Sequence, residues 1–137
     1  MKIVINKCYG GFGLSDLAMK EYAKLKGIKL YPEKDKAFSL ITYYTVPKDK
    51  RVKPIDWNKA SLEERQKYNE KYGKEAIYDK DIPRDDKILV KVVEKLGKKA
   101  SDRFANLEVV EIPDDVEWEI EEYDGSEWIA EKHRTWR

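Results

Sequence analysis

The start of the chain joins an uninterrupted apolar run, a glycine-rich turn and a capped helix. The run 3–5 reads Ile-Val-Ile, which is typical of a strand that is covered on both faces. Segment 9–13 then contains three glycines, which permit positive φ and close backbone approach. Ser15 is placed to cap a helix over residues 16 to about 26, and Gly27 follows where helices commonly end. These signals predict a strand, a tight turn and a helix.

Further along the chain, strand and helix patterns alternate. A strand expected at 28–31 completes an N-terminal β-turn-α-β unit. One apolar helical face predicts a second strong helix from about 85 to 96, and Ser61 opens a more polar helix that extends to about residue 72. The pair Asp124-Gly125 between two alternating runs is a strong hairpin signal. The remaining strands are expected at 39–46, 107–112, 116–123 and 127–132.

The order of these elements predicts an α/β or α+β fold. We expect a single mixed sheet that contains the β-turn-α-β unit, two main packed helices and a C-terminal β-hairpin. A length of 137 residues suits one domain with a single core, so residues 1–137 are treated as a single domain. Segment 34–81 is polar enough to be an inserted or mobile subregion.

Cysteine and histidine usage limits the chemistry of the chain. A single cysteine, Cys8, and a single histidine, His133, exclude an internal disulfide and a Cys/His zinc site within one chain. We therefore expect a reducing compartment, with no metal and no other cofactor. The first apolar run is too short for a signal peptide, and no run approaches the length of a bilayer span. These observations predict a cytoplasmic protein without a membrane partner.

Charge is unevenly distributed although the net charge is only +1. Residues 1–59 hold 13 Lys and Arg against 6 Asp and Glu, whereas residues 104–137 hold 3 against 11. The two ends can pair within the fold, or can present a basic face to a phosphate-bearing ligand and an acidic face to a basic protein surface. We expect no nucleic-acid partner, because the net charge is near zero and the basic residues are interleaved with acidic ones.

The glycine turn is the first candidate for a ligand site. Unpaired backbone N–H groups and a helix N-terminus attract anions such as phosphate. The run Gly10-Gly11-Phe12-Gly13 nevertheless matches neither the dinucleotide-binding pattern nor the P-loop. A phosphate- or nucleotide-binding role and a tight structural turn both stay open.

Side chains near the turn, and others that can approach it, are candidate ligand contacts. Lys7 and Tyr9 lie where the first strand ends, which is where open α/β sheets bind ligands. Arg84 precedes the second strong helix and can reach an anion at the same sheet edge or form a surface ion pair. His133 and Arg134 belong to a C-terminal segment that we expect to dock on the domain. The candidate ligand-binding residues are Lys7, Tyr9, Gly10, Gly11, Phe12, Ser15, Arg84, His133 and Arg134, and none is assigned as catalytic or as a metal ligand.

The predicted C-terminal hairpin is rich in carboxylates. Four glutamates between residues 117 and 122 alternate with aromatic and aliphatic side chains, which places several carboxylates on the solvated face of a strand. A two-residue Asp-Gly turn would put Glu122 opposite Glu127, a like-charge pair that lowers stability unless a cation intervenes. A three-residue turn would remove this clash.

The opening MKIVINKCYGGFGLS and the closing VEWEIEEYDGSEWIAEKHRTW together resemble a family of small proteins that phages and prophages encode and whose function is unassigned. The resemblance extends to the helix region 84–96, whereas the middle, 37–76, falls outside it. Small accessory phage proteins often block a host defence protein or sequester the nucleotide signal that such a defence produces. The resemblance therefore implies an anti-defence role.

These features lead to three hypotheses. The first is a non-enzymatic phage accessory protein that binds a small anionic ligand at the first turn, such as a nucleotide-derived immune signal. The second is an inhibitor of a host protein that uses the acidic hairpin. The third is a small nucleotide-processing enzyme with Cys8 or His133 in its chemistry, although neither has a matched partner at readable spacing. The expected partner is a small anionic ligand or a host protein, and a second copy of the chain is a further option.

Overall fold

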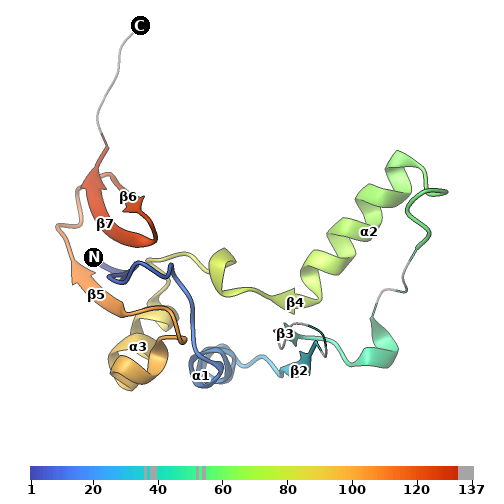
Figure 1. Ribbon diagram of the computed structural model, residues 1–137, viewed down its shortest axis with the longest axis horizontal. Helices are drawn as coiled ribbons and strands as arrows, with labels where there is room; N and C mark the ends of the chain where they lie inside the picture. Colours follow the sequence, from blue (N-terminus) through green and yellow to red (C-terminus); the bar gives the residue numbers. More distant parts are fainter. Residues whose placement is uncertain (36, 38–39, 52, 54, 133–137) are drawn as a thin grey trace, which may run out of the picture. The chain divides into compact units, whose positions relative to one another are not determined.

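The computed structural model describes all residues except 36, 38, 39, 52, 54 and 133–137. The chain divides into two compact units, whose α-helices and most of whose strands are labelled in Figure 1. The first unit combines Met1–Lys26 with Asp79–Arg137, and the second unit is Gly27–Tyr78. The polar segment 34–81 lies largely within the second unit, and the single-domain assignment stays a prediction.

The first unit contains two pairs of antiparallel strands and two α-helices in its described residues. In chain order its elements are β1 (Lys2–Asn6), α1 (Asp16–Lys26), the 3-10 turn η2 (Asp79–Asp81), α3 (Lys87–Leu96), the 3-10 turn η3 (Gly97–Ala100), β5 (Leu107–Glu111), β6 (Trp118–Tyr123) and β7 (Ser126–Glu131). β1 pairs with β5, and β6 pairs with β7 as a hairpin. The strand, turn and helix predicted at the start of the chain are confirmed, and so is the C-terminal hairpin.

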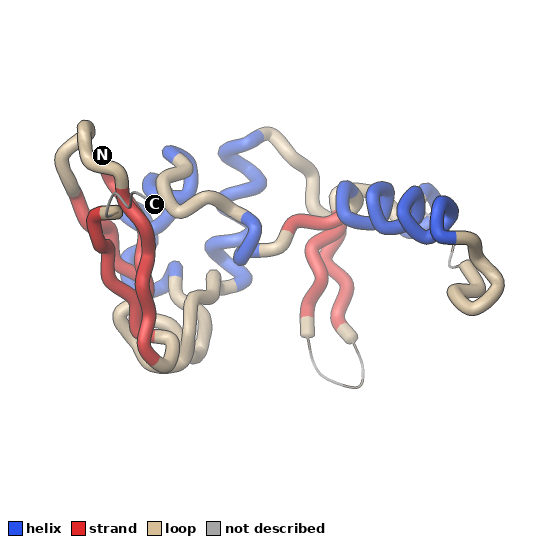
Figure 2. The backbone as a smooth tube through the Cα atoms, turned by 90° about the horizontal axis from the view of Figure 1, so that it is seen from above, coloured by secondary structure: helices blue, strands red, loops and turns tan. Residues whose placement is uncertain are grey.

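The core of the first unit lies between β1 and the helices. The side chains of Ile3, Val4 and Ile5 are at most 1% exposed, which confirms that the strand is covered on both faces. From the predicted apolar face of α3, Leu89 and Val92 are fully buried. α3 packs against α1, β1 and β5. Figure 2 shows the backbone with helices in blue and strands in red. Because burial of one such side chain contributes about 1.5–3 kcal/mol, this core is a firm support for the turn and strand edge described below.

The start of α3 is fixed by a carboxylate cap. Asp86 Oδ1 accepts hydrogen bonds from the amides of Ile88 (2.8 Å) and Leu89 (3.1 Å), so the helix begins at Lys87, slightly later than predicted. Burial tends to raise the pKa of Asp86, but hydrogen bonds from the Leu89 amide, the Tyr22 hydroxyl and the Ile88 amide outweigh it and lower the pKa below its ordinary value. The cap therefore holds its negative charge at the positive end of the helix dipole.

The second unit contains a small antiparallel sheet and one long helix. In chain order its elements are β2 (Tyr31–Lys34), β3 (Ile41–Tyr44), the 3-10 turn η1 (Lys48–Lys50), α2 (Leu62–Lys74) and β4 (Ala76–Ile77). β3 lies between β2 and β4. Ser61 Oγ accepts from the Glu64 amide at 3.1 Å and caps α2 as predicted. No residue of α2 is buried, which confirms a polar helix outside the main core.

The single mixed sheet predicted from the sequence is wrong, although the α+β class is confirmed. The described strands form three separate antiparallel sheets, with the orders β1-β5, β2-β3-β4 and β6-β7. The strand expected at 28–31 begins at Tyr31, and as β2 it pairs with β3 rather than with β1. Pro32 has no N–H to donate, which suits its place on an edge strand. The strand after α1 thus belongs to the second unit. The edge of β1 that does not pair with β5 therefore has to find other hydrogen-bond partners.

Candidate functional site

One edge of β1 pairs with β5, and the other edge is closed by a loop and a side chain. The Val4 amide donates to the carbonyl of Arg84 at 2.9 Å. The Asn6 amide donates to Glu127 Oε1, a carboxylate oxygen from β7, at 2.8 Å. Buried backbone N–H groups need such partners. The Glu127 carboxylate of β7 therefore supplies the hydrogen-bond acceptor that a neighbouring strand would otherwise offer to β1.

Arg84 and Glu127 form a bidentate ion pair at this edge. The Nη1–Oε1 distance is 2.6 Å and the Nη2–Oε2 distance is 2.9 Å. The Arg84 side chain is 19% exposed and the Glu127 side chain 7%. The guanidinium also donates to the Val4 carbonyl at 3.3 Å and lies 3.6 Å from the centre of the Phe12 ring. Arg84 thus lies beside the glycine turn, but its charge is directed to Glu127.

The hairpin turn brings two glutamates opposite each other. Asp124 (φ 51°) and Gly125 (φ 91°) form a two-residue turn with positive φ at both positions, as in the turns that Asp-Gly favours. Glu122 consequently lies opposite Glu127. Glu122 is exposed, whereas Glu127 is buried against Arg84. The cation that this like-charge pair needs is therefore Arg84.

Asn6 is the hydrogen-bonding centre between three loops. Its side chain is fully buried. Its Nδ2 donates to the carbonyls of Cys8 (2.7 Å) and Gly125 (2.8 Å), and its Oδ1 accepts from the amides of Cys8 (3.2 Å) and Asn106 (2.8 Å). The first turn, the hairpin turn and the loop before β5 are thereby tied together. Sequence analysis missed this residue, and its one signal is an amide side chain between an apolar strand and a glycine turn.

The glycines of the first turn allow close backbone contacts. A Cβ atom at Gly10 would overlap the carbonyl of Phe104, and one at Gly125 would overlap backbone atoms of Tyr9 and Gly11. Gly11 and Gly125 also have positive φ, at 92° and 91°. The first turn is thus packed tightly against the hairpin turn and the loop before β5, as a structural turn requires.

The amides just before α1 have partners inside the protein. The Leu14 amide donates to Asp79 Oδ2 at 3.0 Å, and the Ser15 amide donates to the Ala100 carbonyl at 2.9 Å. Ser15 Oγ accepts from the Ala18 amide at 3.1 Å and donates to a carbonyl of η3. The amides of Leu14, Ser15 and Ala18 are therefore satisfied within the protein, by Asp79, the Ala100 carbonyl and the Ser15 cap.

The outer part of the first turn, unlike the part packed against the hairpin, is exposed to solvent. Lys7, Tyr9 and Gly10 are exposed, and Tyr9 is 68% exposed. The amides of Tyr9 and Gly10 donate no hydrogen bond to any residue that the structure describes. This part of the turn can offer two backbone donors, an ammonium group and an aromatic ring to a ligand.

The candidate ligand residues thus fall into groups. Gly10, Gly11, Phe12 and Arg84 lie together at the turn, with Lys7 and Tyr9 exposed beside them. Ser15 serves as the cap of α1. The predicted contacts His133 and Arg134 lie outside the described residues. Cys8 is an exposed free thiol.

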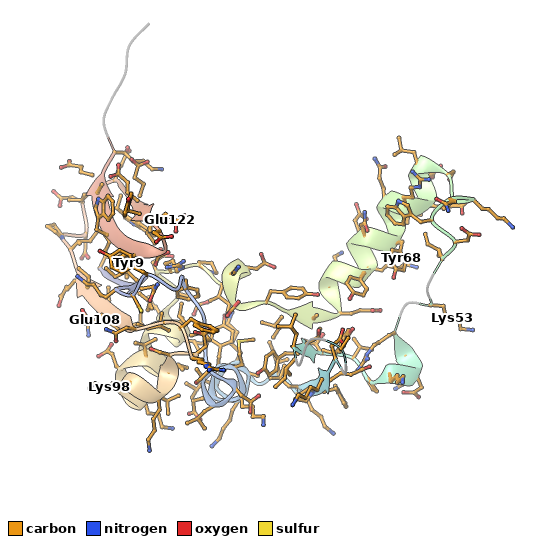
Figure 3. The ribbon with its side chains drawn as sticks, in the orientation of Figure 1. Tyr9, Lys53, Tyr68, Lys98, Glu108 and Glu122 are labelled. Carbon is orange, nitrogen blue, oxygen red and sulfur yellow. The ribbon has the colours of Figure 1, made fainter. Side chains whose placement is uncertain are left out.

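The hairpin has an inner and an outer face, which its register defines. Cross-strand partners share a face, and the pairs Ile120–Ile129 and Glu122–Glu127 lie on the face that buries Glu127. The opposite, outer face carries Glu119, Glu121, Tyr123 and Trp128. Tyr123 is 73% and Trp128 44% exposed, and Trp128 Nε1 donates to Glu121 Oε2 at 3.1 Å. Figure 3 labels Glu122 near the end of this hairpin and Tyr9 on the first turn.

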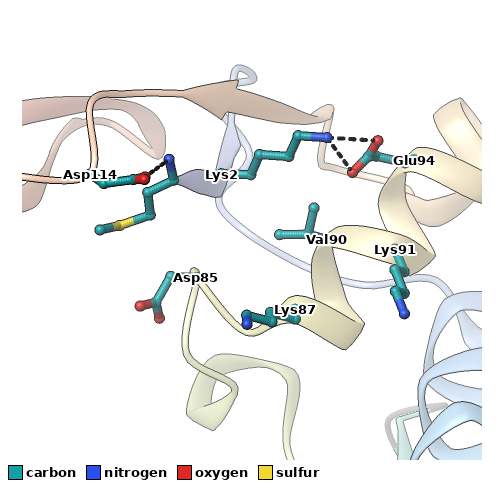
Figure 4. Close-up of a pocket in the computed structure, with 8 residues that line it drawn as sticks. Lys2, Asp85, Lys87, Val90, Lys91, Glu94 and Asp114 are labelled. Carbon is teal, nitrogen blue, oxygen red and sulfur yellow. Dashed lines mark hydrogen bonds and ion pairs between the residues drawn. The ribbon is translucent and has the colours of Figure 1, made fainter.

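A separate cavity of about 500 Å³ lies between the start of β1 and α3 (Figure 4). Val90 lines it, and Lys2 and Glu94 form an ion pair of 3.3 Å at its rim. Lys87 and Lys91 of α3 and the preceding Asp85 also line it. Among the candidate ligand residues that the structure describes, none lines this cavity.

The described residues include no group of three or more His, Cys, Asp or Glu placed to hold a metal ion. None of the helices described is long and apolar enough to cross a bilayer. Comparison with protein-family models, with curated proteins and with solved structures finds no match to this chain.

Proposed function

We propose that this chain is a non-enzymatic binding protein that docks the outer face of hairpin β6–β7 on a basic surface of a host protein. The observation that carries the proposal is the composition of that face, where Glu119 and Glu121 lie beside the exposed rings of Tyr123 and Trp128. Tyr and Trp are the side chains that most often anchor protein interfaces. Carboxylates around them attract a basic partner and orient it.

The hairpin is held in place before any partner arrives. Glu127 on its inner face binds Arg84 and the amide of Asn6, and its turn accepts a hydrogen bond from the Asn6 side chain at Gly125. Trp128 is itself oriented by Glu121. A rigid face loses little conformational entropy on binding. The resemblance to phage-encoded proteins suggests that the partner is a host defence protein.

Charge reversal on the outer face tests this proposal. We expect the variant Glu119→Lys/Glu121→Lys to lose a host protein that the unaltered chain captures from lysate. Its Kd for the purified partner should rise about tenfold or more, because like charges then meet across the interface. The measurement is quantitative mass spectrometry of the captured proteins, followed by titration calorimetry.

The matched control is Glu108→Lys/Glu111→Lys, which makes the same charge change at two exposed positions of β5. It should capture the partner normally. Equal capture by both variants would contradict docking through the outer face, provided that circular dichroism shows both to be folded.

A second candidate function is the binding of a small anionic ligand, such as a nucleotide-derived immune signal, at the outer part of the first turn. The free amides of Tyr9 and Gly10 beside Lys7 favour it. The Tyr9 ring can stack on a base, while the ammonium group and the amides bind phosphate. Arg84 is not needed for this contact, since it holds Glu127.

Thermal unfolding with a panel of cyclic and linear nucleotides tests this second function. A ligand present at 100 times its Kd stabilises the folded state by about 2.7 kcal/mol, which would raise the melting temperature by several degrees. We expect the shift to disappear in Lys7→Ala/Tyr9→Ala. A panel in which no nucleotide changes the melting temperature would rule out this function.

A further inference from the structure

The second unit contains a row of four aromatic side chains. Trp57 contacts Tyr68 edge-on, with 6.2 Å between ring centroids, and Tyr68 stacks on Tyr72 at 5.9 Å. Hydrogen bonding to Tyr72, together with partial burial, raises the pKa of Tyr44 to about 12. The row therefore runs from the loop before α2, along α2, to β3.

Two of the four rings in this row are exposed to solvent, and Tyr44 and Tyr68 are half-buried. Trp57 is 43% and Tyr72 37% exposed. The buried apolar side chains of the described chain all belong to the first unit. The rings of the second unit thus form a surface as well as a packing cluster, and an apolar surface of this kind is typical of a binding site.

Two arginines hold the ends of the row in place. The Arg65 guanidinium lies 5.3 Å from the Trp57 ring centre, and its Nε and Nη2 donate to the Trp57 carbonyl at 3.0 and 2.6 Å. At the other end, the Arg51 guanidinium lies 3.5 Å from the Tyr44 ring and forms an ion pair with Glu33. The rings are consequently oriented before a ligand binds, and each end of the row carries a cation.

The unit that holds the row is basic, although the whole chain is nearly neutral. Residues 27–78 contain 12 Lys and Arg against 8 Asp and Glu, a net charge of +4. Eight of its lysines are exposed and form no ion pair with a described residue: Lys29, Lys34, Lys48, Lys50, Lys53, Lys59, Lys71 and Lys74. Two of these, Lys71 and Lys74, belong to the last turn of α2, which also carries Tyr72. The expectation of no nucleic-acid partner rested on the near-zero charge of the whole chain and on the interleaving of basic with acidic residues. The division into units removes the first of these two arguments.

We propose that the second unit binds single-stranded nucleic acid along this row. Every base has a face that can stack on an aromatic ring, and unpaired bases are free to do so. Lysines beside the rings then contact phosphates and release counterions. A duplex fits less well, because its bases already stack on one another. An acidic protein surface would use the lysines but not the rings.

Fluorescence anisotropy with labelled oligo(dT) and oligo(rU), on the full chain over a range of salt concentrations, tests the proposal. We expect binding at low salt with either probe. In Lys71→Gln/Lys74→Gln the slope of log K against log salt should decrease by about 1.4, since each phosphate contact on a single strand contributes about 0.7. The matched control is Lys98→Gln/Lys99→Gln on η3 of the first unit, which removes two exposed charges and should leave the slope unchanged.

A second pair of variants tests the rings. Trp57→Leu should weaken binding of the single strand about tenfold, and Trp57→Phe, which keeps an aromatic face, should restore most of the affinity. The proposal fails if neither oligonucleotide binds at low salt, or if the η3 control lowers the slope as much as the α2 variant. It also fails if heparin or a duplex binds as tightly as the single strand and Trp57→Leu has no effect, since the site would then be a basic surface only.

Discussion

Arg84→Met is expected to lower the free energy of unfolding by about 3–5 kcal/mol, the cost of leaving a buried charge without its partner. Glu127 is only 7% exposed, so water cannot replace the guanidinium. Methionine retains an apolar stem of similar length against Phe12, which isolates the loss of the charge. Urea denaturation monitored by tryptophan fluorescence measures the change.

The double variant Arg84→Met/Glu127→Gln separates charge from packing. Glutamine keeps an oxygen that can accept from the Asn6 amide, so the double variant should recover much of the stability that Arg84→Met loses. Arg103→Met is the control, because Arg103 is exposed and stacks on an exposed phenylalanine. It should change stability by less than about 0.5 kcal/mol. A loss below about 1 kcal/mol in Arg84→Met would show that the ion pair does not hold the hairpin.

Asn6→Ala is expected to lower the free energy of unfolding by about 3 kcal/mol. The substitution removes four hydrogen bonds and leaves the amides of Cys8 and Asn106 and the carbonyls of Cys8 and Gly125 without this partner. Each buried group left unsatisfied costs about 1–3 kcal/mol, and partial access of water reduces the sum. Chemical denaturation measures the total loss in free energy of unfolding. Faster hydrogen exchange at the Cys8 and Asn106 amides would show that the loss arises at this network.

Asn106→Ala is the matched control for this second prediction. Asn106 takes part in the network through its backbone amide, and it is an exposed residue. The same substitution there should cost less than about 0.5 kcal/mol. Equal stability of the two alanine variants would contradict the central role of the Asn6 side chain.

Local signals predicted the local structure well. Ser15 and Ser61 cap helices, and Asp124-Gly125 forms a hairpin turn, because each acts on neighbours within a few residues. Strand partners were not predictable in this way. A strand–turn–helix–strand order does not show which strands pair with each other. In the structure β2 pairs with β3, while β1 pairs with β5.

The candidate site was predicted only in part for the same reason. The opposition of Glu122 and Glu127 follows from a two-residue turn, but its counterion Arg84 lies 43 residues from Glu127. From the sequence, Glu127 is one more carboxylate of an acidic hairpin. Only the register shows that it lies on the inner face while Glu119 and Glu121 lie on the outer one. Sequence periodicity therefore finds the carboxylates and leaves their roles undetermined.

The closure of β1 by Glu127 has a consequence for synthesis of the chain. The Asn6 amide and its acceptor are 121 residues apart, and at 5–20 residues per second a ribosome needs roughly 6–24 s to make the intervening chain. During that time the Ile-Val-Ile run of β1 has neither β5 nor the hairpin beside it, and exposed β-branched runs are prone to aggregate. Contacts so distant in sequence also slow folding itself. We therefore expect this protein to depend on holding chaperones while it is being made.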